Sequence, residues 1–385
     1  MNHYYTDLHI HIGRTKSGRA VKITGAKSLT FSNIIAHARD KKGLNMIGII
    51  DCHSPEVILE MEEHMEAEEL IELPGGGLSY GGLTIIPGSE LEIYDETCHG
   101  PIHVLCFFSD IPTMKRFSDW LSNHLKNIHL SSQRIYVSGK ELQYTVKEMG
   151  GLFIPAHVFT PFKSLYGKGV QESLTEVFDP ELIDAIELGL SSDTYMADGI
   201  KELHSYTFLS NSDAHSLGKI AREYQTIAMN EPTFEELKKA LSNQQGREIV
   251  ANYGLDPLLG KYHQTACEKC QYPFDPNDEK CANCGHHKYI KGVADRIAEL
   301  SQDSKRPDRP PYIHQVPLEF IPGLGPKIMG KLLDHFGTEM AILHEVSSEH
   351  LQQVVPTAMA ERIIAARTGT IQLAAGGAGK YGKII

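Results

Sequence analysis

Residues 7–13, DLHIHIG, give the strongest indication of the fold, because they combine the periodicity of a strand with metal-binding side chains. In an extended strand, successive side chains point to opposite faces. Asp7, His9 and His11 then share one face, whereas the other face is aliphatic. Imidazole nitrogens are common ligands of transition metals, and strand geometry aims both rings the same way. This stretch therefore predicts a strand that forms the first wall of a metal cleft.

Strand-like and helix-like segments alternate along the first three-fifths of the chain. In the helix expected at 30–43, Thr30 or Ser32 is the candidate N-cap and Gly43 the candidate residue after the C-terminus. Such alternation predicts an α/β fold with a mostly parallel sheet, either open or closed into a barrel. The expected strands are 3–11, 44–51, 83–93, 101–108, 150–158, 182–189 and 206–215, and the other expected helices are 55–73 and 114–128.

Metal-binding residue types recur where the later strands end. Asp51 and His53 follow one apolar strand, and Glu90 follows the next. The carboxyl ends of parallel strands meet at one edge, where such folds place their active sites. A single histidine is more often a hydrogen-bonded core residue, so the prediction of a multinuclear site rests on the combination. The candidate ligands are His9, His11, Asp51, His53, Glu90, His103, His157, Asp213 and His215.

These candidates are expected to differ in role. Carboxylates can bridge two ions, so the mixture suits a multinuclear site of divalent ions such as Zn²⁺, Mn²⁺, Fe²⁺ or Mg²⁺. Asp7 lies deeper from the end of its strand, and we expect it to orient a ligand histidine rather than to bind an ion. The residues expected to serve catalysis directly are His9, His11, Asp51, Glu90, His157 and Asp213.

Two C-x-x-C pairs lie close together, separated by ten residues. They are formed by Cys267, Cys270, Cys281 and Cys284. This spacing is typical of a structural zinc site with four thiolates, and a redox dithiol is the alternative. The segment is too short to form a hydrophobic core, so we expect one zinc ion to hold it folded. Such modules often bind nucleic acid, but many only brace neighbouring domains.

The segment PGLGP (322–326) precedes an amphipathic helix with Ile328, Leu332 and Leu333 on its apolar side. This pattern is typical of a helix-hairpin-helix motif, in which Gly323 and Gly325 would let backbone N–H groups approach a DNA phosphate. Lys327 and Lys331 would reinforce that contact. An ordinary packing corner between two helices is the alternative. Residues 355–364, VPTAMAERII, could be a degenerate second hairpin.

The charge of the chain is unevenly distributed. The net charge is −12, but the residues from Lys288 onward hold 12 basic and 10 acidic side chains, a net of +2. Metal cations would offset part of the acidity of the first 287 residues. The loop after the first strand is basic, and Arg14, Lys16 and Arg19 either contact a substrate phosphate or form a solvated surface.

The composition divides the chain of 385 residues into three expected domains. These are a barrel at 1–250, a zinc module at 260–290 and a helical DNA-binding domain at 291–385. The last of these contains a Pro-rich linker at 301–312 and ends in a mobile Gly-rich tail. No apolar run is long enough to span a membrane, and the N-terminus lacks the features of a secretory signal, so a cytoplasmic protein is expected.

The motifs of the first 245 residues resemble those of the polymerase and histidinol phosphatase (PHP) superfamily. The matching elements are DLHIH, the Asp51/His53 element, GSELEI, HVL, PAHV and SDAH. The resemblance implies a distorted seven-stranded β/α barrel that binds up to three metal ions and hydrolyses phosphate esters. It also implies that Glu90 bridges two ions. Cys52 separates Asp51 from His53, where many members have adjacent Asp and His, so which of the two binds metal stays open, with Asp51 favoured.

Together with the zinc module and the hairpin, the chain resembles the endonuclease Q family over nearly its whole length. The resemblance implies a DNA repair enzyme that nicks DNA 5′ of deaminated bases (uracil, hypoxanthine, xanthine) and of abasic sites. The nick would leave a 3′-hydroxyl and a 5′-phosphate, with the damaged nucleotide flipped into a pocket. Aromatic residues that could stack on a flipped base are Tyr80, Phe159, Phe162 and Tyr166.

The expected partner is DNA, duplex or single-stranded, which would associate the protein with the nucleoid, and a sliding clamp is a further candidate partner. Two alternatives stay open. A PHP phosphatase or exonuclease would act on small phosphate esters or nucleic-acid ends, and the two added modules argue against the phosphatase. A non-catalytic DNA-binding scaffold would have lost its metal ligands, and the complete candidate set argues against it.

Overall fold

Seven strands form a closed ring. The computed structural model describes residues 1–260, 262–370, 373–374 and 383–384. Neighbours in the ring pair in the order β1–β2–β5–β6–β8, and β9 pairs with β10. The strands are β1 (Asn2–Ile10), β2 (Met46–Ile49), β5 (Leu83–Ile93), β6 (Ile102–Phe107), β8 (Leu152–Pro155), β9 (Ile186–Glu187) and β10 (Phe208–Leu209).

Backbone hydrogen bonds close the two remaining gaps in the ring. Between β8 and β9, the N–H of Asp184 donates to the carbonyl of Phe153 at 3.0 Å. Between β10 and β1, Ala214 accepts from His11 at 3.2 Å and donates to His9 at 3.1 Å. Buried apolar side chains such as Leu8 fill the interior. The expected α/β fold with a distorted seven-stranded barrel is therefore confirmed.

The sheet is mixed, so the expectation of mostly parallel pairing is wrong. β1, β2 and β5 run parallel, but β5, β6 and β8 pair antiparallel. The first half of β1 also leaves the ring and pairs antiparallel with β11, which leads to β12 and β15. The strands outside the ring are β3 (Ile71–Glu72), β4 (Leu78–Tyr80), β7 (Arg134–Ile135), β11 (Tyr224–Met229), β12 (Glu248–Gly254) and β15 (Tyr312–His314).

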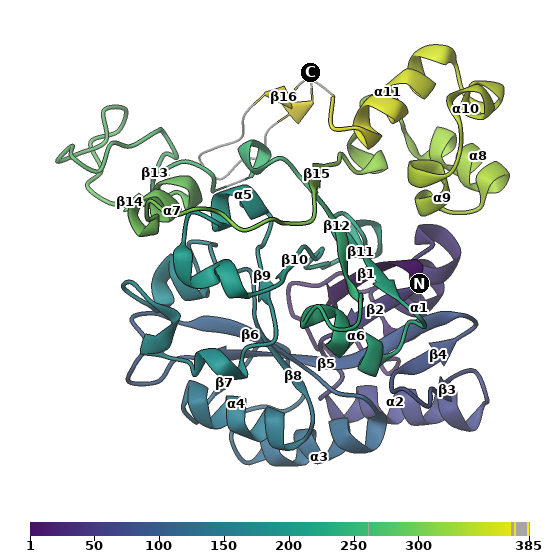
Figure 1. The fold of residues 1–385 in the computed structure, drawn as a ribbon, viewed down its shortest axis with the longest axis horizontal. Helices are drawn as coiled ribbons and strands as arrows, with labels where there is room; N and C mark the ends of the chain where they lie inside the picture. Colours follow the sequence, from purple (N-terminus) through teal and green to yellow (C-terminus); the bar gives the residue numbers. More distant parts are fainter. Residues whose placement is uncertain (261, 371–372, 375–382, 385) are drawn as a thin grey trace.

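Helices cover the outside of the barrel, with α2, α3 and α4 along its lower side in Figure 1. Thr30 caps α1 by accepting from the N–H of Asn33, and Gly43 ends the following π-helical turn with φ +79°, as the sequence predicted. The helices of this region are α1 (Phe31–His37), continued by a π-helix (Ala38–Lys42), α2 (Pro55–Glu66), α3 (Ile111–Ser122), α4 (Gly139–Glu148), α5 (Thr194–Ala197) and α6 (Phe234–Leu241).

The C-terminal modules lie above the barrel in Figure 1. The Pro-rich linker packs against the barrel, because Arg309 pairs with Asp198 at 2.9 Å and stacks over Phe208 at 3.9 Å. The elements are β13 (Ala266–Cys267), β14 (Tyr289–Ile290), α7 (Val293–Leu300), α8 (Pro326–Phe336), α9 (Glu339–His344), α10 (Ser348–Val354), α11 (Thr357–Arg367), β16 (Leu373–Ala374) and β17 (Lys383–Ile384).

The predicted Gly-rich tail lies mostly outside the described residues, and the three domain boundaries stay a prediction. No helix in the described part of the chain combines the length and the apolar character needed to cross a membrane.

Candidate metal centre

The strand β1 brings His9 and His11 side by side, with ring centroids 5.3 Å apart and both side chains buried. Each ring has its Nδ1 held by a carboxylate. Nδ1 of His9 lies 2.9 Å from Glu187, and Nδ1 of His11 lies 3.0 Å from Asp51. Because a carboxylate only accepts, each Nδ1 donates its proton to that carboxylate, and each Nε2 is the ring atom that could bind a metal ion. Neither Nε2 has a hydrogen-bond partner among the described residues, which is the arrangement of histidines that ligate metals.

Two carboxylates face these Nε2 atoms. The Glu90 carboxylate, on β5, lies 3.6 Å from the Nε2 of His9 and 3.6 Å from that of His11. One oxygen of Asp213 lies 3.5 Å and 3.4 Å from the same two atoms and 3.3 Å from the Nε2 of His215. The side chain of Asp213 is 34% exposed and that of Glu90 is 1% exposed, so Asp213 forms the open side of the centre.

The ligand atoms form three overlapping groups in which all atoms lie within 4.8 Å of one another. Glu90 and His11 each belong to two groups. The two carboxylate oxygens of Glu90 could bridge adjacent ions, whereas Nε2 of His11 could bind only one of them. Imidazole nitrogens and carboxylate oxygens are donors that fit Zn²⁺, Mn²⁺ and Fe²⁺. The groups are His9, His11 and Glu90; His11, Asp213 and His215; and Glu90, His103 and His157.

The electrostatics of the centre favour cations. Burial acts to lower the pKa of His9, but the carboxylates of Glu187, Asp213 and Glu90 outweigh it and raise that pKa to about 10. Burial acts to raise the pKa of Glu90, but His103 and Lys22 hold it well below its usual range. The carboxylates are therefore ionised at neutral pH, and bound divalent ions would neutralise them.

Unusual backbone conformations fix two of the grouped residues. His157 has φ +32° and Asp213 has φ +44°, and residues other than glycine rarely adopt positive φ values. Beside them, Gly189 has φ +79°, and a Cβ at this position would lie 2.8 Å from the Cβ of His157. Strained backbone conformations therefore set the direction of the His157 and Asp213 side chains.

Asp51 and His53 lie outside the three groups. One oxygen of Asp51 accepts from Nδ1 of His11 and, at 2.8 Å, from the backbone N–H of Ile12. Nδ1 of His53 pairs with the hydroxyl of Ser89 at 2.8 Å. The Asp51 carboxylate therefore holds the His11 ring, and both ring nitrogens of His53 have partners outside the groups, because its Nε2 lies 3.3 Å from the carbonyl of Leu130.

Asp7 differs from the expectation that it orients a histidine ring. Its oxygens accept from the backbone N–H groups of His9 at 3.3 Å, Ser212 at 3.1 Å and Ala221 at 2.9 Å. The pairing register of β1 with β2 also shifts between Asp7 and Ile10. The carboxylate ties β1 to the segment after β10 instead.

Two residues of the centre were missed from the sequence. Glu187 holds His9 and also accepts from the backbone N–H of His157 at 2.8 Å. It lies two positions before the end of the expected strand 182–189, so an acid near a further strand end was the available indication. Lys22 reaches the centre from a loop, and its Nζ lies 3.1 Å from Glu90. The sequence pattern around Lys22 gave no indication that this side chain reaches the centre.

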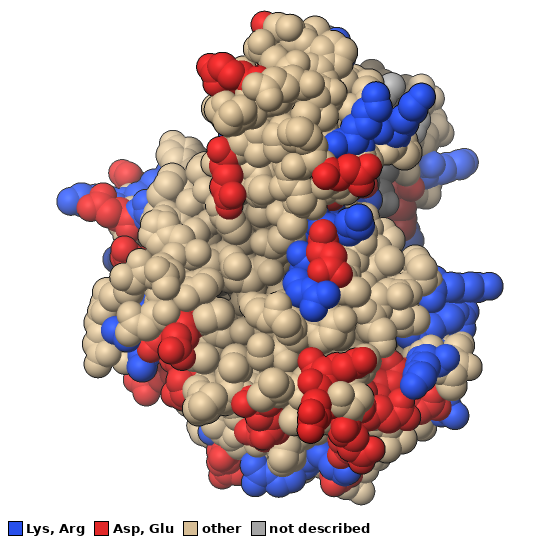
Figure 2. Space-filling view, turned by 90° about the vertical axis from the view of Figure 1, so that its right-hand side faces the viewer, with Lys and Arg blue, Asp and Glu red and all other residues tan. Residues whose placement is uncertain are grey.

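The three loop cations, for which either phosphate contact or a solvated surface was expected, point toward α2 or their own loop. Lys16 pairs with Glu63 at 2.8 Å, Arg19 pairs with Glu56 at 2.6 Å, and Arg14 donates to a carbonyl of the loop. Figure 2 shows acidic side chains gathered on the lower part of the face that it presents. The structure does not bring these three cations to the grouped ligands.

The four cysteines of the predicted zinc module converge. Sγ of Cys267 lies 3.6 Å from that of Cys284, Sγ of Cys270 lies 3.5 Å from that of Cys281, and all four lie within 4.8 Å of one another. Phe274, stacked on Tyr289, is the one other residue in the buried cluster of this module. Such a small apolar cluster fits a module that a metal ion holds folded.

The predicted hairpin forms a turn with Gly323 at φ +84° and Gly325 as the N-cap of α8. Both glycines, Lys327 and Lys331 are exposed. α11 lies beside this turn, because Arg362, in the middle of that helix, donates to the carbonyl of Pro322 at 3.0 Å. The turn before α8 and the middle of α11 are therefore neighbours.

The four aromatic candidates for base stacking differ in exposure. Phe159 and Tyr166 are buried against each other, and Tyr80 lies on β4 under Arg39. Phe162 is 44% exposed and contacts Tyr262, which lines the cavity beside the metal centre. Of the four, Phe162 is the one with an accessible face near the centre.

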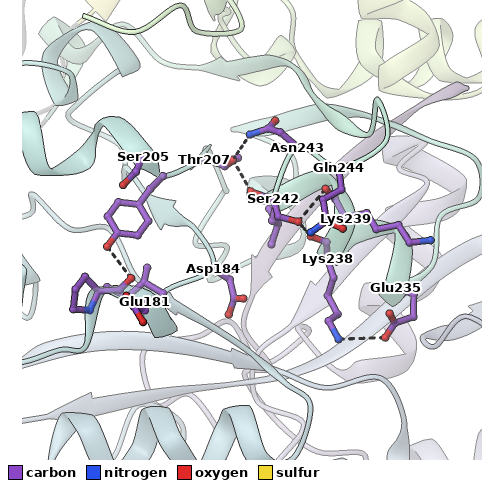
Figure 3. A pocket seen from close by; sticks show the side chains of 14 residues that line it. Glu181, Asp184, Ser205, Thr207, Glu235, Lys238, Lys239, Ser242, Asn243 and Gln244 are labelled. Atoms are coloured by element: carbon purple, nitrogen blue, oxygen red, sulfur yellow. Dashed lines mark hydrogen bonds and ion pairs between the residues drawn. The ribbon is translucent and has the colours of Figure 1, made fainter.

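Cavity size does not locate the centre. The cavity in Figure 3, about 780 Å³, lies where β9 and β10 begin, at the end of the barrel away from the ligands. It contains no histidine or cysteine, and Lys238 in its wall pairs with Glu235 at 3.4 Å. The cavity that includes Asp213 and His215 has only about 270 Å³. The grouped ligands, not the volume, mark the site.

No protein-family model matches the chain. The chain is 60% identical to the uncharacterised protein YqxK of Bacillus subtilis over the full length of both. It is 40% identical over 252 residues to an uncharacterised protein of Methanocaldococcus jannaschii, a match that covers 59% of this chain and 31% of that protein.

Two solved structures match the whole chain. One is the lesion-specific endonuclease PfuEndoQ of Pyrococcus furiosus, with a TM-score of 0.85 and 34% identity over 95% of that protein. The other is an endonuclease Q in complex with a 27-mer duplex that carries an abasic lesion at the active site, with a TM-score of 0.84 and 33% identity over 96% of that protein. The chain therefore belongs to the endonuclease Q family.

Proposed function

We propose that this protein is a metal-dependent DNA repair endonuclease that cuts the phosphodiester on the 5′ side of deaminated bases and abasic sites. The observation that carries the proposal is the convergence of three metal-ligand groups at one end of the barrel. The full-length similarity to a lesion-specific endonuclease, and to a relative solved on an abasic duplex, supports DNA as the substrate. Uracil, hypoxanthine and xanthine are the proposed deaminated bases.

The proposed reaction is a hydrolysis. The oxygen of a water molecule bonds to phosphorus while the P–O3′ bond breaks, and its electron pair stays on O3′. O3′ takes up one proton and the attacking water releases another, which leaves a 3′-hydroxyl and a 5′-phosphate. Divalent ions, when bound, supply hydroxide at neutral pH and neutralise charge on the phosphoryl oxygens.

The residues of the proposed metal centre have different roles. Nε2 of His9 and His11, with the carboxylate of Glu90, would hold one ion at the buried side of the centre. Glu187 and Asp51 fix the two imidazoles from behind. The exposed side at Asp213 leaves room for a phosphate to approach. The barrel interior below the centre is apolar and excludes water from the other direction.

A groove beside the centre supports a nucleic-acid substrate. It has about 480 Å³ and lies between the loop after β8 and the zinc module. Lys168, Lys288 and Lys291 line it together with the exposed aromatic rings of Phe162 and Tyr289. Basic side chains next to accessible rings are typical of surfaces that bind DNA strands. The exposed hairpin at Gly323 and Gly325 offers a second contact to phosphate.

An Asp213→Ala variant tests the proposal. The assay uses an end-labelled duplex with one deoxyuridine, deoxyinosine or abasic site, and Mn²⁺ or Mg²⁺. Wild-type protein is expected to nick each duplex, and Asp213→Ala should lose turnover while its DNA affinity, measured by fluorescence anisotropy, stays close to wild type. Phosphate release from a small monoester with the duplexes intact would favour a phosphatase. Undiminished nicking by the variant would contradict the proposed metal centre.

A further inference from the structure

Lys22 places an ammonium group inside the metal centre. Its side chain is 14% exposed, and its Nζ lies 3.1 Å from Glu90 and 2.6 Å from the hydroxyl of Ser132. Among the described ion pairs, Lys22 is the one lysine or arginine that pairs with Glu90 or Asp213. The centre otherwise contains imidazoles and carboxylates.

The backbone holds Lys22 in this place. Its N–H donates to the carbonyl of Ile12 at 2.8 Å, and the N–H of Val21 donates to that of Gly13 at 3.0 Å. On the other side, the carbonyl of Val21 accepts from Ser131 at 3.0 Å. The loop is thus fixed to the end of β1, next to His11, and the lysine side chain has a defined direction.

The other cations near the centre are engaged elsewhere. Lys16 and Arg19, in the same loop, pair with acids of α2. Arg222, in the wall of the 270 Å³ cavity, donates to the backbone carbonyls of Ser212 and Asp213. Lys22 is therefore the cation of this region that faces the ligand carboxylates.

We propose that the Lys22 ammonium binds a non-bridging oxygen of the scissile phosphate, an inference that rests on the proposed function. An ammonium has three donors, and Glu90 and Ser132 take two of them. Bound divalent ions would neutralise Glu90 and so weaken its hold on the ammonium. The phosphodiester is then the strongest anion within reach, and its charge grows as the P–O3′ bond breaks.

The competing interpretation is that Lys22 only neutralises Glu90 within the protein. The two interpretations differ in whether the charge of the substrate phosphate matters. A methylphosphonate linkage replaces one non-bridging oxygen by a methyl group and removes this charge. The test therefore compares duplexes with one deoxyuridine whose scissile linkage is either a phosphodiester or one isolated methylphosphonate isomer, for both isomers in turn.

Affinities are measured by anisotropy with Mn²⁺ in the Asp213→Ala background, which prevents turnover. Lys22→Met is expected to weaken binding of the phosphodiester duplex about 10-fold, as for a lost hydrogen bond to a charged group. With at least one methylphosphonate isomer, the Asp213→Ala protein should bind the duplex with the same affinity whether or not it also carries Lys22→Met. In otherwise wild-type protein, Lys22→Met should lower single-turnover nicking about 100-fold with unchanged metal content, and Lys22→Arg should recover part of the loss.

Lys147→Met is the matched control, because Lys147 also pairs with a carboxylate, Asp184, at 2.6 Å, but at the opposite end of the barrel. It should behave as wild type. An equal penalty of Lys22→Met on all linkages, or a loss of metal that accounts for the loss of nicking, would overturn the proposal. If the Lys22→Met protein does not fold, Lys22→Gln replaces it in the same binding and nicking measurements. Absence of nicking by wild-type protein would instead refute the proposed function.

Discussion

Replacing Glu187 with glutamine tests whether a buried carboxylate aims His9 at the metal centre. The Glu187 carboxylate accepts from three groups, which are Nδ1 of His9 at 2.9 Å, Nδ2 of Asn211 at 2.8 Å and the backbone N–H of His157 at 2.8 Å. Glutamine has nearly the same shape, but one end of its amide is a donor. In either orientation of the amide, this NH₂ group faces at least one of the three donors.

The structure sets the size of the effect. A buried donor left without an acceptor costs about 1–3 kcal/mol, and about 1.4 kcal/mol is a factor of ten in an equilibrium constant. Loss of the carboxylate charge also makes the Nε2 of His9 a weaker ligand. We therefore expect Glu187→Gln to lose about 10- to 100-fold in metal affinity or in nicking rate, the usual range for a residue behind a metal ligand.

The assay is a titration of metal-stripped protein with Zn²⁺ or Mn²⁺ in competition with a chelator, followed by nicking rates at saturating Mn²⁺. Glu202→Gln is the control, because Glu202 accepts from Tyr166 and Ser173 and lies outside the three ligand groups. DNA affinity should change in neither variant. A folded Glu187→Gln protein that equals Glu202→Gln in metal affinity and nicking would refute the orienting role of Glu187.

Two further predictions concern the zinc module and pH. Cys270→Ser removes one of four converging thiols, so the module should lose its zinc and become sensitive to limited proteolysis while the barrel retains its metal, which metal analysis of the purified variant checks. Burial raises the pKa of Glu223 to about 8. Because the folded pKa exceeds that of the unfolded chain, the stabilising contribution of the neutral carboxyl is full below about pH 4.5 and is lost as the pH rises through 8, by about 1.4 kcal/mol per pH unit at most. Urea unfolding should therefore show a decline in stability between pH 5 and pH 8 that Glu223→Gln lacks, and equal pH profiles would contradict this assignment.

The sequence predicted the elements whose side chains alternate strictly or whose caps are marked. DLHIHIG placed His9 and His11 on one face because alternation in a strand needs no tertiary information. Thr30 and Gly43 bounded their helix by local hydrogen bonds and backbone conformation alone. The four cysteines converge as their spacing indicated.

What the sequence did not predict depends on contacts between distant residues. β11 pairs with β1, more than 200 residues away along the chain, and β12 pairs with β11. Alternation of strands and helices therefore gave no indication of their antiparallel direction. Glu187 acts on His9 across 178 positions of sequence. The position of Lys22 depends on how a loop without repeating pattern folds back on β1.

The same limit applies to residue types that fit several roles. Asp7, Asp51 and Glu187 are all buried acids near the ligand histidines. Asp7 binds backbone N–H groups, whereas Asp51 and Glu187 each hold a histidine ring. Sequence spacing cannot separate these outcomes, because each depends on a few ångströms of side-chain direction.

The position and chemistry of the nick distinguish a metal-dependent, lesion-specific endonuclease from the alternatives. The measurement uses a duplex with one deoxyuridine, labelled at the 5′ end, incubated with Mn²⁺ and resolved beside a sequencing ladder, with a thymidine duplex as control. The account predicts one cut immediately 5′ of the deoxyuridine, with a 3′-hydroxyl that a polymerase extends, no cut in the thymidine duplex, and no cut after removal of metal by a chelator. Equal cutting of both duplexes, or cutting that persists without divalent metal, would contradict it.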